Sequence, residues 1–137
     1  MRILGLDYGR RRVGVAISDP DGKIATPYIT LIIRDIEGLI VEIEDIVLNE
    51  GIELIVLGNP IRDDGKVAGL SAEIEKFAKK LEGNLGIKVK LIDEYYSSAR
   101  AKGKLVEDRG LKLKGKKHLI DQMAAVDILQ NYLDYKT

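Results

Sequence analysis

Acidic residues at three separate positions of the chain are of the type that could hold a divalent cation against a phosphate. Asp7 ends one apolar run, the pair Asp93 and Glu94 ends another, and Asp121 lies in the first turn of the last predicted helix. Carboxylate oxygens are the ligands that Mg²⁺ and Mn²⁺ prefer. Two such ions about 4 Å apart would activate a water and stabilise the leaving oxygen, with no histidine as general base. The residue types therefore predict metal-assisted displacement at phosphorus.

Each of these carboxylates also has an interpretation that involves no chemistry. Asp7 could simply begin a turn, since Asp and Gly are common turn residues. Glu94 could be a surface residue before a helix, and Asp121 could be an acid favoured by the helix dipole. His118, three positions before Asp121, could face the same site or could only start the helix. The spacing alone leaves these alternatives open.

Basic residues gather in two places that could contact a phosphate backbone. Arg10 and Arg12 follow Asp7 closely, and strand alternation sends both to the same side, although strand-edge arginines also serve solubility. Residues 100–117 carry eight bases against two acids, whereas residues 34–64 carry two bases against nine acids. A basic segment can meet a polyanion even in a chain of zero net charge, or it can be a solvated loop. The candidates in this segment are Arg100, Lys112, Lys114, Lys116 and Lys117.

The composition argues against several other kinds of site. Because the chain has no cysteine, it can form neither disulfides nor thiolate metal centres. A single histidine argues against a histidine-rich zinc site. The length of 137 residues fits one domain, residues 1–137. No apolar stretch approaches the roughly 20 residues of a membrane span, and no basic-then-apolar leader precedes the first strand, so we expect a cytoplasmic protein.

The elements that position these residues follow from the spacing of apolar side chains. They alternate with period two in the predicted strands and recur with period 3.6 in the predicted helices. The strands are predicted at residues 2–7, 12–19, 23–33, 53–57 and 87–94. The helices are predicted at residues 36–47, 70–81, 97–107 and 118–135, with Gly51 and Gly83 as stops for the first two. The remaining long connections, residues 58–66 and 109–117, are predicted loops.

This order of elements predicts an α/β fold with a mixed five-stranded sheet. The first three strands have short connections and form an antiparallel meander, and the first, fourth and fifth strands become parallel neighbours. Their carboxyl ends share one edge, where open α/β sheets bind ligands, and that edge carries Asp7 and the pair Asp93 and Glu94. Ala124 and Ala125 follow Asp121 on the same helix face, so small side chains would let this helix approach the sheet.

Four separated motifs span the chain from end to end. They are LGLDYGRRRVGVAISD at residues 4–19, VLGNPIRDDGK at 56–66, LIDEYYSSARA at 91–101 and DQMAAVDILQNYL at 121–133. In content, order and spacing they resemble the YqgF (RuvX) family, whose members are described as Holliday-junction resolvases and as nucleases that mature pre-16S ribosomal RNA. The resemblance implies an RNase H-like fold and a phosphodiesterase centre that uses Mg²⁺ or Mn²⁺. Carried over by motif, the ligands would be Asp7, Glu94 and Asp121, and further family positions are matched by Arg12, Ser18, Asp19, Gly58, Pro60 and Gly65.

The third motif departs from the family pattern at one place that matters. The family usually has an arginine after the Asp-Glu pair, where this chain has Tyr95. The change removes a positive charge beside the implied metal site, which puts a phosphate-binding role at this position in doubt. Arg100 could take over that role, and Tyr95 could instead stack on an unpaired base. Ser97 and Ser98 replace the usual threonines and keep their hydroxyl groups.

Three functions remain compatible with these observations. We favour a metal-dependent endonuclease that acts on structured nucleic acid, as a monomer or homodimer; cutting a four-way junction symmetrically would require a two-fold dimer. The second is a non-catalytic nucleic-acid-binding module of the same fold, for which Tyr95 is the best argument. The third is an actin-like ATPase or sugar kinase. Those proteins also begin with an Asp-x-Gly strand turn, but they need two such halves, and this chain supplies one.

Overall fold

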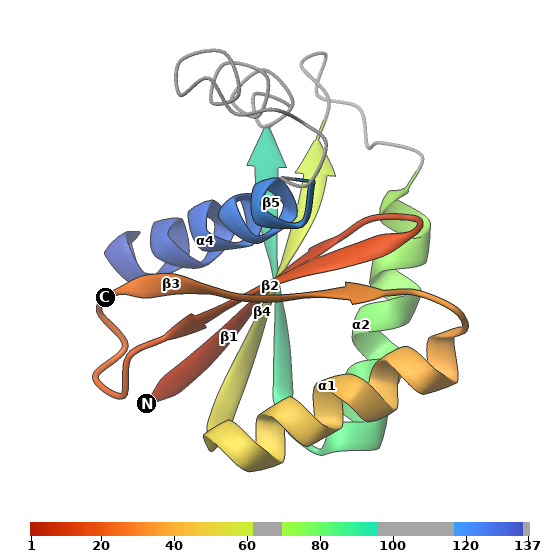
Figure 1. Cartoon of the computed structure of the whole chain (residues 1–137), viewed down its shortest axis with the longest axis horizontal. Helices are drawn as coiled ribbons and strands as arrows, with labels where there is room; N and C mark the ends of the chain where they lie inside the picture. The colour runs from red at the N-terminus through yellow and green to blue at the C-terminus, as the bar shows by residue number, and fades with distance from the viewer. Residues whose placement is uncertain (62–69, 96–116, 136–137) are drawn as a thin grey trace.

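Five strands form one mixed sheet in the computed structural model, which describes residues 1–61, 70–95 and 117–135. The strands are β1 (Arg2–Tyr8), β2 (Arg12–Ser18), β3 (Ala25–Ile32), β4 (Ile52–Ile61) and β5 (Lys88–Tyr95). Their order across the sheet is β3-β2-β1-β4-β5 (Figure 1). β1 and β3 each pair antiparallel with β2, whereas β4 runs parallel to both β1 and β5. The predicted meander followed by parallel strands is confirmed.

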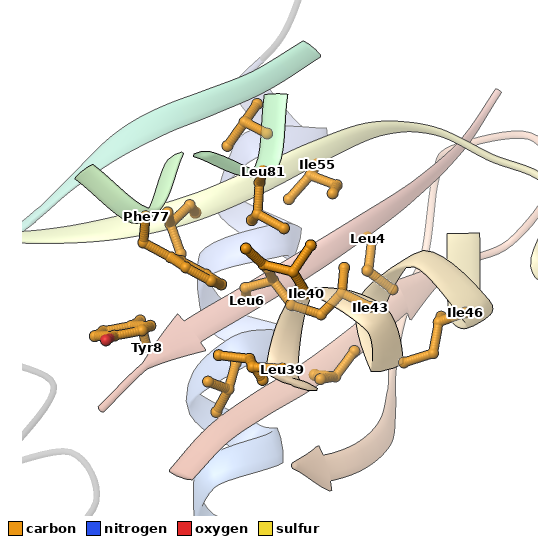
Figure 2. Close-up of a cluster of buried hydrophobic side chains, with 14 of the residues drawn as sticks. Leu4, Leu6, Tyr8, Leu39, Ile40, Ile43, Ile46, Ile55, Phe77 and Leu81 are labelled. Carbon is orange, nitrogen blue, oxygen red and sulfur yellow. The ribbon is translucent and has the colours of Figure 1, made fainter. Parts of the chain in front are cut away.

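Helices cover both faces of this sheet. α1 (Ile36–Glu50) and α2 (Ser71–Leu85) pack on one face, and α4 (Lys117–Tyr135) lies across the other (Figure 1). Alternation along β1 serves both layers: Leu4 and Leu6 join the core beneath α1 and α2, while Ile3 joins the core beneath α4. Figure 2 shows the first of these cores, where the side chains of Leu4 and Leu6 meet those of Ile43 from α1 and Leu81 from α2. A strand buried on both faces needs the near-continuous apolar run that β1 has.

Left-handed glycines end the two helices of the first layer. Gly51 has φ 64° and its N–H donates to the Val47 carbonyl, so the predicted stop of α1 is confirmed. The stop predicted for α2 at Gly83 is wrong. Gly83 lies inside the helix, which continues to Leu85 and ends at Gly86, where φ is 69° and the N–H donates to the Glu82 carbonyl. Both glycines permit a turn, but only Gly86 takes the left-handed conformation.

Two other predicted boundaries are wrong, and both changes affect the site. β4 continues beyond the predicted 53–57, because residues 58–61 pair in parallel register with residues 92–95. α4 begins at Lys117, so Lys117 is helical rather than part of a loop, and Asp121 lies one turn into the helix. The predicted helix at 97–107 and most of the predicted loop residues, namely 62–66 and 109–116, lie outside the described residues.

Two residues of the first motif stabilise the start of the sheet. Ser18 is buried, and its Oγ accepts a hydrogen bond from the N–H of Ile3 at 2.8 Å. Asp19 closes the β2–β3 turn, since its carboxylate accepts from the N–H groups of Ile24 at 2.9 Å and Lys23 at 2.7 Å. These two residues therefore have structural roles in the turn that leads into β3.

We expect Asp19→Asn to reduce stability at neutral pH but not in acid. The backbone N–H groups of Ile24 and Lys23 lower the pKa of Asp19, so its ionised form stabilises the fold. This contribution is present above the unfolded pKa of about 4 and is lost as the pH falls through the lower folded pKa. Urea unfolding of the parent and the variant between pH 7 and pH 2 should show a difference that shrinks towards acid. A difference that is constant over this range would contradict the assignment.

None of the helices within the described ranges is both long and apolar enough to cross a membrane.

Candidate functional site

Asp7 lies near the carboxyl end of β1, between two glycines on the neighbouring strands. On β2 its pairing partner is Gly14. On β4, Leu57 pairs with Leu6, so Gly58 is one step further along, beside Asp7. Both glycines face α4, and neither has a side chain to fill the space next to the half-buried Asp7. Room is therefore left on both sides of this carboxylate for groups from other elements.

The backbone of α4 occupies the space above Gly14. A methyl group added at Gly14 would lie 2.0 Å from the carbonyl oxygen of Asp121 and 3.1 Å from its Cβ. The helix stays close further along, where a methyl group at Gly5 would lie 2.7 Å from the Cβ of Leu129. Ala125, which was predicted to face the sheet, is fully buried. The sequence-based reasoning found the small residues of the helix but missed these strand glycines, which set how closely it approaches.

The space above Gly58 is filled by the side chain of Ile128 from α4, whose Cδ1 lies 2.5 Å from the position that a Cβ at Gly58 would take, with Glu94 beside it. Glu94 pairs with Pro60 near the end of β5, and its Oε2 lies 3.2 Å from the position that a Cβ at Gly58 would take. The carboxylate of Glu94 therefore lies over the strand next to Asp7. Alternation along β5 sends the side chain of Asp93 to the opposite face of the sheet, where it is exposed. Of this acidic pair, only Glu94 has its side chain on the face of the sheet that Asp7 faces.

Arg12 forms an ion pair with Asp121 across 109 residues of sequence. The Arg12 Nε donates to the Asp121 Oδ2 at 2.8 Å. The two side chains are 35% and 17% exposed, so water screens this pair only in part. Arg12 lies two residues before Gly14 on β2, and therefore on the same face of the strand. The same contact that brings α4 onto Gly14 thus places Asp121 within reach of Arg12.

The structure gathers the three predicted acidic residues at one rim of the sheet. Asp7 lies on β1, and Glu94 and Asp121 are seated over the glycines that flank it. All three offer hard oxygen donors, which is the donor chemistry that suits Mg²⁺ and Mn²⁺. Within residues 1–61, 70–95 and 117–135, however, no group of three His, Cys, Asp or Glu side chains is close enough to hold a metal ion. The convergence of the backbone is observed, whereas a shared cation stays a prediction.

The structure gives less detail about the other residues that were predicted to contact nucleic acid. Arg10 is exposed in the turn between β1 and β2. Tyr95 is the last residue of β5, and Lys117 and His118 lie in the first turn of α4. The remaining candidates lie outside the described residues: Arg100, Lys112, Lys114 and Lys116.

A separate groove of about 410 Å³ opens on the α1 and α2 side of the sheet. The rings of Tyr8 and Phe77 both line it, with their centroids 4.9 Å apart and their planes inclined by 38°. Burial raises the pKa of Tyr8, and the charge of Glu73 raises it further. Because Tyr8 follows Asp7 directly on β1, alternation sends the two side chains to opposite faces. The groove is therefore not part of the carboxylate rim, and its lining is Tyr8, Ile36, Glu73, Lys76, Phe77 and Lys80.

The arrangement of sheet and helices defines an RNase H-like fold of the kind found in junction resolvases. The chain superposes on Thermus thermophilus RuvC in complex with a Holliday junction substrate with a TM-score of 0.57, covering 98% of this chain and 94% of that one at 12% identity. The fowlpox virus Holliday junction resolvase gives a TM-score of 0.58, with 98% of each chain covered at 17% identity. At these identities the likeness shows the fold alone, and it confirms the predicted fold class.

The chain belongs to the RuvX family, described as Holliday junction resolvase, whose family model matches residues 1–135. A relative from Chloroflexus aggregans is 39% identical over 96% of this chain and 92% of its own length. Another from Moorella thermoacetica is 34% identical over 98% and 95%. Both relatives are named, provisionally, as pre-16S rRNA nucleases. The resemblance to the YqgF (RuvX) family is thereby confirmed, and the family is one of hydrolases that act on nucleic acid.

Proposed function

We propose that this protein is a metal-dependent endonuclease that hydrolyses phosphodiester bonds in structured nucleic acid. The observation that supports the proposal most directly is the seating of Asp121 and Glu94 over Gly14 and Gly58, the glycines on either side of Asp7. This arrangement brings carboxylates from three distant segments to one rim. Membership of the RuvX family supports the same activity.

Asp7, Glu94 and Asp121 would hold Mg²⁺ or Mn²⁺ through their carboxylate oxygens. When bound, the cation supplies activation of the attacking water and charge stabilisation of the leaving oxygen. Asp7 is proposed as the central ligand because Glu94 and Asp121 lie over the glycines of the strands on either side of it. Their attachment to two strands and to a helix packed on glycine would limit their movement during the reaction.

Basic and aromatic residues around this rim would bind the nucleic acid. Positive side chains contact the phosphate backbone and make binding depend on salt, and an aromatic ring can stack on an unpaired base. This part of the proposal covers Arg10, Arg12, Tyr95, Arg100, Lys112, Lys114, Lys116 and Lys117.

The names of the relatives and structural neighbours suggest two substrates. The relatives point to pre-16S ribosomal RNA, of which we propose processing at the 5′ end, and the structural neighbours point to four-way DNA junctions. The proposal includes both, with action as a monomer on RNA or as a two-fold homodimer on a junction. It also includes a single nuclease domain over residues 1–137 and a cytoplasmic location, which the absence of cysteine favours.

A cleavage assay on the purified full chain tests this proposal. A four-way DNA junction and an RNA that spans the 5′ end of 16S ribosomal RNA would each be incubated with Mg²⁺, with Mn²⁺ or with EDTA. We expect cleavage of at least one substrate with metal and none in EDTA, because carboxylates alone cannot stabilise the negative charge that develops on the leaving oxygen. Cleavage that continues unchanged in EDTA would contradict metal dependence. Salt-sensitive binding without turnover in any metal would favour the non-catalytic binding module, the alternative for which Tyr95 in place of arginine argues.

A further inference from the structure

The ion pair between Arg12 and Asp121 engages a carboxylate that is also a proposed metal ligand. The Arg12 Nε lies 2.8 Å from the Asp121 Oδ2, which is the separation of a charge-assisted hydrogen bond. Asp121 cannot easily turn away, since its backbone rests on Gly14 and its side chain is only 17% exposed. A divalent cation at this carboxylate would therefore lie close to the Arg12 guanidinium, and two positive charges at such a distance repel.

The Arg12 guanidinium also has N–H groups that could bind a second partner. Only its Nε is engaged, because in the part of the chain that the structure describes neither Nη atom takes part in a hydrogen bond or ion pair. The side chain is 35% exposed at the start of β2, on the same rim as Asp7. A guanidinium offers paired N–H donors whose geometry matches a phosphate. Arg12 can thus serve either the carboxylate or a phosphate of a bound strand.

We propose that Arg12 leaves Asp121 when a divalent cation binds that carboxylate, and that its guanidinium then binds a phosphate of the nucleic acid. This inference rests on the proposed metal-dependent nuclease function and deepens it. Before loading, Arg12 neutralises Asp121 and holds it in place. After loading, the positive charge of Arg12 is used at the substrate. Metal and nucleic acid therefore strengthen each other's binding, and thermodynamic linkage requires the effect to be mutual.

Metal affinity gives the first test. Mn²⁺ would be titrated calorimetrically into the full-length parent, into Arg12→Gln and into Arg11→Gln, a matched control in which an exposed neighbour loses the same charge. We expect Arg12→Gln to bind Mn²⁺ about fivefold more tightly or better, which is the lower end of typical coupling between two ligands. Arg11→Gln should bind as the parent does. A purely structural role for Arg12 predicts the opposite result, because a loosened Asp121 would bind Mn²⁺ more weakly.

Binding of a four-way DNA junction in EDTA gives the second test. In the parent without metal, Arg12 stays on Asp121 and makes no phosphate contact of its own. Asp121→Ala releases Arg12 and should therefore raise the affinity. The plot of log affinity against log salt concentration should also become steeper, by about the slope that one phosphate contact adds. The double variant Arg12→Gln/Asp121→Ala should return to the parent slope, which separates a released arginine from the mere loss of a negative charge. Asp121→Asn, which keeps the shape of the side chain, serves if the alanine variant does not fold.

The outcomes separate this inference from the function on which it rests. If the parent binds Mn²⁺ and cleaves, but Arg12→Gln binds Mn²⁺ no more tightly, the exchange of partners is overturned and the nuclease stands. If Arg12→Gln binds Mn²⁺ more tightly in a protein that cleaves nothing, the competition is supported and the nuclease function fails. A parent that binds no Mn²⁺ overturns both. A steeper salt slope that persists in the double variant also overturns the transfer to phosphate.

Discussion

Replacing Asp7 with asparagine should lower the cleavage rate by about a thousandfold or more while nucleic-acid binding survives. The size of the loss is that of removing a principal catalytic group, because Asp7 is the proposed central ligand, on the strand between those that Asp121 and Glu94 overlie. An amide is a neutral and weaker ligand for a hard cation, but it fills the same space, so the fold should not change. Single-turnover cleavage with Mg²⁺ measures the rate, and a mobility-shift assay in EDTA measures binding.

Asp93→Asn is the matched control for this experiment. It makes the same chemical change next to Glu94, but on an exposed side chain on the opposite face of the sheet. We expect its cleavage rate to equal that of the parent within about twofold. If Asp7→Asn cleaves as fast as the parent, the carboxylate centre is wrongly assigned. If both variants lose activity equally, the effect is one of overall charge and not of the site.

Replacing Gly14 with alanine should lower the free energy of unfolding by about 3 kcal/mol, the upper part of the range for overpacked cores. The new methyl group would lie 2.0 Å from a backbone carbonyl oxygen of α4, and a backbone atom cannot turn aside as a side chain can. The helix must therefore shift away from β2. That shift would also move Asp121 away from Asp7 and Arg12. The cleavage rate should therefore fall as well as the free energy of unfolding. Urea unfolding monitored by circular dichroism measures the first effect.

Gly83→Ala provides the control for a glycine substitution that meets no obstacle. Gly83 lies inside α2, and apart from its chain neighbours and the backbone of its own helix, no heavy atom of the described residues lies within 4 Å of the position that its Cβ would take. Alanine is favoured over glycine in a helix interior by about 1 kcal/mol, so this variant should be more stable and equally active. If Gly14→Ala is as stable as the parent, α4 does not rest on β2 as closely as the structure shows.

Local patterns in the sequence were sufficient to predict most of the fold. Period-two alternation and the period of 3.6 found the five strands and the helices among the described residues, and short connections indicated which strands pair antiparallel. The sharing of one edge by the ends of β1 and β5 followed from the rule for parallel strands. Such signals work because each element must bury an apolar face, and burial leaves its period in the sequence of that element alone.

The boundaries that the sequence missed depend on contacts with distant segments. β4 reaches Ile61 because β5 supplies hydrogen-bond partners for its last residues. α2 passes Gly83 and ends at Gly86, and nothing in the local pattern distinguishes the two glycines. Propensity is a weak signal that tertiary packing overrides.

The sequence by itself determined which residues are candidates for chemistry and that the carboxyl ends of β1 and β5 share one edge of the sheet. The tertiary structure alone decided what surrounds these candidates: Gly14 and Gly58 lie beside Asp7, and Arg12 binds Asp121 from 109 residues away. A glycine in a strand looks the same in sequence whether it faces water or a helix backbone. Only the packing of α4 on the sheet distinguishes these cases, because close approach is a property of two surfaces and not of either segment.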